Sequence, residues 1–103
     1  MIKILTAIGD PFLNTQIKKE NDFEVIGKDI LYKEAILEML NKNSNIDVVI
    51  ISELLEGQID TYEMLKEINR INSKIKIIYI LEKNNFNFEN LSKKEKNIII
   101  IYN

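Results

Sequence analysis

The stretch DVVIISELLEG, from Asp47 to Gly57, constrains the fold more than any other part of this chain. It opens with the apolar residues Val48 to Ile51, which are all β-branched, and then turns through polar residues to a glycine. A continuous apolar run of this kind is typical of a strand buried on both faces, as in a parallel sheet. In such sheets ligands bind just beyond the carboxyl ends of the strands. We therefore expect a functional residue of this strand to be Ser52 or Glu53.

The rest of the chain alternates between predicted strands and predicted helices. Strands are expected at 2–8, 23–27, 46–51, 75–81 and 98–102, and helices at 11–20, 30–42 and between 60 and 72. Asp10, Asp29 and Asp60 are predicted N-caps, and Asp60 with Glu63 resembles a capping box. A short or irregular helix is expected within 82–97. This alternation predicts one α/β domain over residues 1–103, with three layers (α/β/α), a parallel sheet and right-handed crossovers.

The composition excludes several classes of chemistry. The chain has no cysteine and no histidine, which rules out thiol nucleophiles, imidazole bases and most zinc or haem sites. The net charge of −2 predicts no attraction to nucleic acid or anionic membrane, and Glu95 interrupts the small basic cluster of Lys93, Lys94 and Lys96. We expect no enzymatic activity, no cofactor and no small-molecule substrate. With no signal peptide and no apolar stretch near the roughly 20 residues of a membrane span, we expect a cytoplasmic domain.

The pattern as a whole resembles the CheY-like receiver domain of response regulators, whose five-stranded flavodoxin-like sheet has the order 2-1-3-4-5. DVVIISELLEG resembles the central strand and loop of that family, of the form DLVLLDxxLPG. The resemblance places Ser52 at the phosphoacceptor aspartate and Gly57 at the glycine of the loop. It places the Mg²⁺-binding acidic pair at Ile8 and Gly9, with Asp10 nearby. The Ser/Thr that ends the fourth strand corresponds to about Leu81, and the lysine after the fifth strand lies near Tyr102 or Asn103.

These positions depart from the family together. A receiver uses a carboxylate nucleophile, a carboxylate-bound Mg²⁺ and a lysine to transfer a phosphoryl group. The resemblance with these departures therefore implies a pseudo-receiver with no catalytic, cofactor-binding or metal-binding residues. Each of three positions has a functional and a simpler role. Ser52 is a modified or phosphorylated site or the cap of a turn, and Glu53 is a permanent negative charge that imitates a phosphorylated aspartate or a solvated loop acid. Asp10 is a remaining metal ligand or an N-cap. A weak divalent-ion site formed by Asp10, Glu53 and Glu56 is a further alternative.

Receivers end with a fifth helix, whereas this chain ends at its predicted fifth strand. If that helix is missing or supplied elsewhere, apolar positions on one face of the sheet are left open, and such a surface usually marks an interface. We expect either the N-terminal part of a longer protein or a homodimer that forms over this face.

Atypical receivers of this kind resemble the N-terminal domain of the TadZ- or CpaE-like group of MinD/ParA-type ATPases in pilus assembly. This resemblance implies a non-catalytic module for protein–protein interaction, regulation or localisation. No Gly-rich P-loop lies in the chain, so the ATPase activity itself is not carried over. One alternative is a phosphate-independent response regulator that controls another output domain. Another is a flavodoxin-like domain that binds a small ligand at the loops after the first and third strands.

Overall fold

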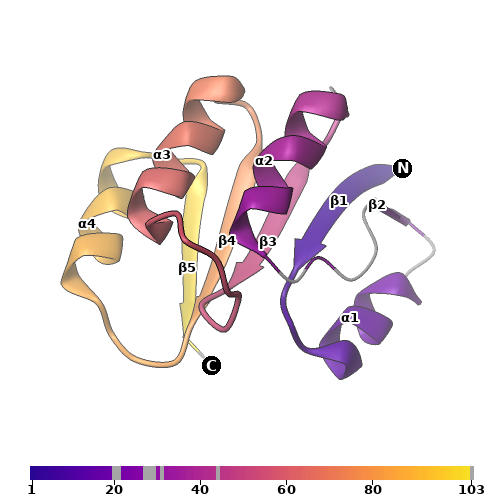
Figure 1. Ribbon diagram of the computed structural model, residues 1–103, viewed down its shortest axis with the longest axis horizontal. Helices are drawn as coiled ribbons and strands as arrows, with labels where there is room; N and C mark the ends of the chain where they lie inside the picture. The colour runs from indigo at the N-terminus through magenta and orange to yellow at the C-terminus, as the bar shows by residue number, and fades with distance from the viewer. Residues whose placement is uncertain (20–21, 27–29, 31, 44, 103) are drawn as a thin grey trace.

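The computed structural model describes residues 1–19, 22–26, 30, 32–43 and 45–102, which form five strands and four helices. The strands make one parallel sheet in the order β2-β1-β3-β4-β5 (Figure 1). This confirms the predicted CheY-like, flavodoxin-like α/β architecture. The elements in chain order are β1 (Ile2–Ala7), α1 (Pro11–Lys18), β2 (Phe23–Ile26), α2 (Lys33–Lys42), β3 (Val48–Ser52), α3 (Thr61–Ile71), β4 (Lys76–Leu81), α4 (Phe86–Lys94) and β5 (Ile98–Tyr102).

The helices are divided between the two faces of the sheet. In Figure 1, α2, α3 and α4 lie side by side in front of the strands. The chain steps from β1 to β2 in one direction and from β1 through β3 to β5 in the other. Because parallel crossovers are right-handed, this reversal puts α1 on the opposite face, where it packs against β2.

The pairing register sorts the strand side chains into two sets. Leu5, Val49, Ile77 and Ile98 are in register across four strands, and the neighbouring positions Thr6, Ile50, Ile78 and Ile99 point the other way. We call the first side, beneath α2–α4, the covered face. We call the second side of the last three strands the open face; its apolar positions are Val48, Ile50, Ile78, Ile80, Ile99 and Ile101.

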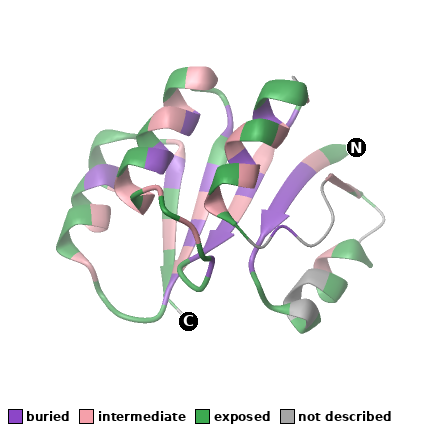
Figure 2. Ribbon diagram, viewed as in Figure 1, coloured by how far each residue is buried: buried purple, intermediate pink, exposed green. Residues whose placement is uncertain are grey.

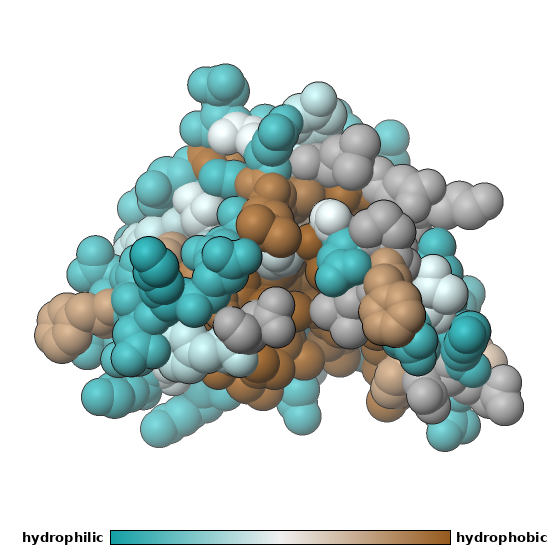
Figure 3. Space-filling view, turned by 90° about the horizontal axis from the view of Figure 1, so that it is seen from below, coloured by the Kyte–Doolittle hydropathy of each residue, from teal (hydrophilic) through white to brown (hydrophobic). Residues whose placement is uncertain are grey.

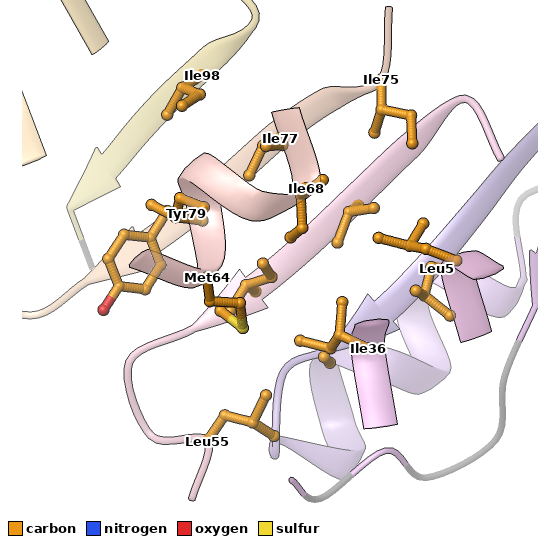
Figure 4. Close-up of a cluster of buried hydrophobic side chains, with 14 of the residues drawn as sticks. Leu5, Ile36, Leu55, Met64, Ile68, Ile75, Ile77, Tyr79 and Ile98 are labelled. Atoms are coloured by element: carbon orange, nitrogen blue, oxygen red, sulfur yellow. The ribbon is translucent and has the colours of Figure 1, made fainter. Parts of the chain in front are cut away.

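The hydrophobic core lies between the covered face and the three helices. Figure 4 shows Ile36 from α2 and Met64 and Ile68 from α3 packed over Leu5, Ile77 and other strand residues. Figure 2 shows the same division along α2 and α3, where buried positions alternate with exposed ones. The periodicity of 3–4 residues in Met64, Leu65 and Ile68 produces this buried stripe, as the sequence predicts.

Local capping confirms two of the predicted helix starts. The Asp10 carboxylate accepts a hydrogen bond from the Phe12 N–H at 3.0 Å, and the Asp60 carboxylate accepts one from the Glu63 N–H at 3.1 Å. Asp29 lies outside the described residues. The helix within 82–97 is regular from Phe86 to Lys94, and the Asn85 side chain caps it by accepting from the N–H groups of the second and third helical residues.

The sequence predicts Phe12 among the apolar contacts of the helix at 11–20 and Tyr32 among those of the helix at 30–42, and both predictions are wrong. Helix α2 begins at Lys33, because Tyr32 adopts an extended conformation and forms a parallel bridge with Glu56. Tyr32 is therefore largely exposed and does not belong to the buried stripe of α2. The side chain of Phe12, which was expected to pack on the sheet, is 73% exposed because it lies on the solvent side of α1.

Candidate functional site

The residues that correspond to receiver positions lie at the carboxyl edge of the sheet. Ala7 is in register with Ile51 at the ends of β1 and β3, and Leu81 is in register with Tyr102 at the ends of β4 and β5. Figure 3 looks onto this edge from below and shows apolar surface through the middle of the view, with polar side chains around it. The structure thus brings the expected positions to one edge.

Ser52 is the last residue of β3 and is buried. Its Oγ accepts a hydrogen bond from the N–H of Leu54 at 3.1 Å, and its carbonyl accepts one from the N–H of Leu55 at 3.2 Å. The side chain therefore stabilises the turn that follows the strand, which is the simpler of the two roles considered for it. The described residues place no imidazole or thiolate beside it, since the chain contains neither group.

Glu53 connects two loops at this edge. Its N–H donates to the carbonyl of Ile80 at 3.0 Å, and its carboxylate accepts a hydrogen bond from the N–H of Glu82. The side chain thus bridges the loop after β3 and the loop after β4. Glu53 is exposed. One interpretation of the sequence made it a freely solvated loop acid, but its carboxylate is hydrogen-bonded to the loop after β4.

The loop after β1 has a different make-up from a two-acid metal site. Ile8 is buried, Gly9 has a positive φ of 71°, and Asp10 caps α1. Within the described residues, no group of three or more aspartate, glutamate, histidine or cysteine side chains is placed to hold a metal ion. Asp10, Glu53 and Glu56 accordingly do not form the acidic cluster that the sequence left open.

Leu81 and Tyr102 end the last two strands as neighbours. Leu81 is buried in the core, whereas Tyr102 is exposed and its hydroxyl donates a hydrogen bond to the Glu89 carboxylate on α4. This bond raises the pKa of Tyr102 above its ordinary value, because ionisation would lose the donated proton and place two negative charges together. Tyr102 therefore links β5 to α4, where a receiver has its lysine region.

A set of contacts that the sequence analysis missed holds the loop between β3 and α3. The Glu34 carboxylate accepts hydrogen bonds from the N–H groups of Gln58 and Ile59, at 3.2 and 3.3 Å. Lys33 donates from its Nζ to the Ile59 carbonyl at 3.0 Å and from its backbone N–H to the Glu56 carbonyl at 2.8 Å. The only sequence signal for this clamp is an acidic residue in the first turn of α2, which is too common to be specific.

Gly57 lies inside the clamped loop, where its φ of 143° favours glycine. A Cβ at this position would lie 2.6 Å from Oε2 of Glu34. The backbone conformation therefore favours glycine, and any side chain at this position would have to displace the Glu34 carboxylate.

The polar side chains at this edge form hydrogen bonds that hold the loops in place. The Ser52 hydroxyl, the Glu53 carboxylate and the Glu34 carboxylate each accept hydrogen bonds from backbone N–H groups of the loops they stabilise. Backbone N–H groups paired in this way are not available to bind an anion. The edge is built as a hydrogen-bonded framework.

No family model and no curated protein sequence matches the chain. Two solved structures are similar to it. One is RcsB from Salmonella enterica serovar Typhimurium bound to the promoter rprA with the phosphomimetic BeF3−, with a TM-score of 0.67 and 21% identity over 97% of this chain. The other contains two RcsB dimers bound to two parallel DNAs, with a TM-score of 0.70 and 20% identity over 96% of this chain. The chain spans 53% and 55% of the length of those chains.

These similarities correct the expectation that excluded nucleic acid from the partners. Both similar structures are complexes with DNA, so a protein that contains this fold can bind DNA. The exclusion was wrong because it used the net charge of these 103 residues as a guide to every partner. Such a charge describes only non-specific attraction by the residues counted, which here make up about half the length of the RcsB chains.

The fold and the arrangement of the sheet edge support the same structural assignment. The sheet order, the helix placement and the likeness to the two RcsB structures agree over almost the whole chain. This chain has a CheY-like, flavodoxin-like α/β fold.

Proposed function

We propose that this chain is a receiver-type module that works without phosphoryl transfer and has no enzymatic activity. The observation that carries the proposal is the state of Ser52, which stands at the carboxyl end of the central strand. Its hydroxyl is buried and caps the turn to Leu54, and the neighbouring Glu53 carboxylate is bonded to the Glu82 N–H. The position that would receive a phosphoryl group is thus part of the loop framework.

The clamp from α2 supports the same proposal. Receiver signalling requires a change of conformation, and a ligand can shift an equilibrium only if a second state is accessible. Here Lys33 and Glu34 tie the loop between β3 and α3 through three hydrogen bonds from or to their side chains. A loop held in one arrangement suits a module that offers a constant surface to protein partners.

The experiment exposes the purified chain to acetyl phosphate, and separately to beryllofluoride, with Mg²⁺. We expect no gain in mass from a phosphoryl group and no change in the amide spectra of Ser52 to Gly57. A receiver with an intact carboxylate site serves as the positive control. A phosphorylated product, or a beryllofluoride-dependent shift at these amides, would contradict the proposal.

Two settings for such a module differ in what it controls. In the first, it is the regulatory or localisation domain of a MinD/ParA-type ATPase of pilus assembly in the TadZ- or CpaE-like group, in the cytoplasm. In the second, it controls a DNA-binding output domain, as a phosphate-independent response regulator. The likeness to DNA-bound RcsB chains, of which it spans about half, is a specific observation that favours the second setting.

The coding sequence that follows residue 103 separates the two settings. A Gly-rich P-loop after a predicted strand would favour the ATPase, because it supplies the phosphate-binding backbone that this chain lacks. A helix-turn-helix would favour the DNA-binding output.

In the described residues no helix is both long and apolar enough to cross a membrane.

A further inference from the structure

A cleft of about 830 Å³ lies between α3 and α4, which the functional positions of the sheet edge do not use. Helix α3 packs against α2, while α4 packs against β5, and the cleft opens where the two helices separate. Its volume falls within the roughly 300–1,000 Å³ usual for ligand sites. The residues that matter for its chemistry are Tyr62, Asn87, Phe88, Asn90, Lys93 and Lys94.

Two aromatic rings form an apolar part of the cleft lining. The rings of Tyr62 and Phe88 come from facing helices, with centroids 6.1 Å apart. Phe88 also meets the buried Tyr79 edge-on, with a centroid distance of 4.8 Å. The Phe88 ring is therefore held in place from the core side, and the pair offers a firm apolar surface to a side chain from outside.

A polar stripe on α4 runs beside these rings. Asn87, Asn90 and Lys94 are spaced by three and four residues, so they lie on one side of the helix. From Asn87 to Lys94 the helix rises about 10 Å, which matches about three residues of an extended chain. Carboxamides both donate and accept hydrogen bonds, as the backbone of an extended peptide does.

Three lysines lie in or near the cleft. Lys93 and Lys94 line the cleft, and Lys66 of α3 has its Nζ 5.6 Å from the centroid of the Tyr62 ring. The one ion pair in the described part of the chain joins Glu67 and Arg70, so none of these three lysines takes part in one. Lys93 and Lys94 in the lining, with Lys66 beside the Tyr62 ring, favour a ligand that combines carboxylates with an apolar side chain.

We propose that the α3–α4 cleft binds an extended acidic segment of a partner protein. An apolar side chain of the segment packs on Tyr62 and Phe88, its backbone bonds to Asn87 and Asn90, and its carboxylates face Lys93 and Lys94. The proposal deepens, and rests on, the function proposed above. Single-stranded nucleic acid is the less favoured ligand, because the Tyr62 and Phe88 rings are tilted by 48° and form no continuous platform for stacked bases. Asp60, which also lines the cleft, uses its carboxylate to cap α3.

Fluorescence anisotropy with labelled peptides tests this site directly. The acidic probe contains the sequence Glu-Phe-Glu-Phe-Glu; a charge-reversed probe replaces each Glu with Lys, and an anchor-free probe replaces each Phe with Ala. We expect only the acidic probe to bind well, with about tenfold weaker binding when the phenyl groups are removed. No binding of the acidic probe, equal binding of the charge-reversed probe, or equal binding of the anchor-free probe would overturn the proposal.

Matched charge variants locate the binding. We expect Lys93→Glu with Lys94→Glu to weaken binding of the acidic probe at least about tenfold, because two attractions become repulsions. Lys18→Glu with Lys19→Glu makes the same change in net charge near the end of α1, on the opposite face of the sheet, and should alter the affinity less than about twofold at moderate salt. Equal weakening by the two pairs would show a general charge effect and overturn the site.

A nearly isosteric variant tests the cleft with little risk to folding. Asn90→Asp, which turns an exposed donor into a carboxylate, should weaken binding about fivefold through repulsion, whereas Asn45→Asp at a distant exposed position should not. An oligothymidine that binds in place of the acidic peptide would overturn the peptide assignment.

The two proposals fail in different ways. Phosphorylation of the chain would contradict the proposed function, and peptide binding at the cleft would be measured independently of that result. A chain that resists phosphorylation but ignores the acidic probe would leave the proposed function standing and remove only the cleft.

Discussion

The two faces of the sheet carry similar side chains and have different surroundings. On β4 and β5, Ile77 and Ile98 of the covered face are buried beneath the helices. Ile99 and Ile101 of the open face are 44% and 45% exposed. The strands are apolar on both sides, as is usual for parallel sheets that are covered by helices on both faces. The difference shows that burial here depends on which helices reach each face, and among the described residues α1 packs mainly against β2, outside the open face.

The largest expected effect compares isoleucines from the two faces. Ile77→Ala should lower the free energy of unfolding by about 3 kcal/mol, because it removes buried methyl groups and leaves a cavity in a packed layer. Ile99→Ala should lower it by less than about 1 kcal/mol, because the side chain already contacts solvent. Urea denaturation of both variants measures the difference. Equal losses would mean that the open face is packed in solution.

The next effect compares the loops that serve the two layers. Gly57→Ala should cost about 1–3 kcal/mol, because it strains a positive φ and displaces the Glu34 carboxylate from the clamp. Gly9→Ala, in the loop that leads to α1, meets no atom within 4 Å and should cost only about 1–2 kcal/mol of backbone strain.

A double-variant cycle isolates the contribution of the clamp at Gly57. If Glu34→Ala is introduced first, Gly57→Ala should cost less than it does in the wild type, because the clashing carboxylate is gone. Thermal or urea unfolding of the four proteins measures the coupling. Strict additivity would show that backbone strain alone makes glycine necessary at this position.

A smaller effect compares the buried and the exposed tyrosine. Burial raises the pKa of Tyr79, although the Thr61 side chain acts in the opposite direction. A raised pKa means that the folded state holds the phenol proton more tightly than the unfolded state. This contribution to stability is therefore complete below about pH 10, the ordinary tyrosine pKa, and is lost as pH rises through the folded pKa.

Tyr79→Phe should accordingly flatten the loss of stability at alkaline pH, and should change the stability at neutral pH by about 1 kcal/mol or less. Urea midpoints measured across the alkaline range test this. Glu89→Gln provides the comparison: it should lower the pKa of Tyr102 toward the ordinary value, as followed by ultraviolet absorbance, and leave Tyr79 unchanged. An unchanged titration curve would remove the role assigned to the Tyr102–Glu89 bond.

The smallest effect concerns the open face alone. Ile99→Asn with Ile101→Asn should change the free energy of unfolding by about 1 kcal/mol or less, and should reduce binding of a fluorescent apolar dye. The matched pair Lys74→Asn with Lys83→Asn, at exposed positions outside the strands, should leave dye binding unchanged. Unaltered dye fluorescence in the isoleucine variant would show that the apolar surface lies elsewhere.

Much of the fold could be predicted from local patterns. The five strands, the parallel sheet, the caps at Asp10 and Asp60 and the buried stripe of α3 follow from periodicity, capping chemistry and the handedness of crossovers. The position of Ser52 at the end of the central strand was predicted for the same reason. The sheet order was predicted from the resemblance to CheY-like receivers. Helix α4 was expected to be irregular because asparagine weakens helices, but Asn85 caps it and Leu91 is buried in the core.

The site could be predicted less completely because its contacts join distant segments. Glu34 is more than twenty residues from the loop N–H groups that it binds. Glu53 binds the N–H of Glu82, so the bond joins the loops that follow the neighbouring strands β3 and β4. Neither the direction of a side chain nor the partner it meets follows from local spacing. The cleft between α3 and α4 is of the same kind, since Tyr62 and Phe88 are ordinary amphipathic-helix positions until the two helices face each other.

By itself the sequence determined the alternation of strands and helices, the parallel sheet and the absence of histidine and thiol chemistry, because these depend on composition and on short-range periodicity. It also placed Ser52, in a run that begins at Asp47, where a receiver keeps its phosphoacceptor. Only the tertiary structure decided what Ser52 and its neighbours do there. Each hydrogen bond that occupies them depends on the relative position of loops brought together by the sheet, and sequence spacing does not encode that position.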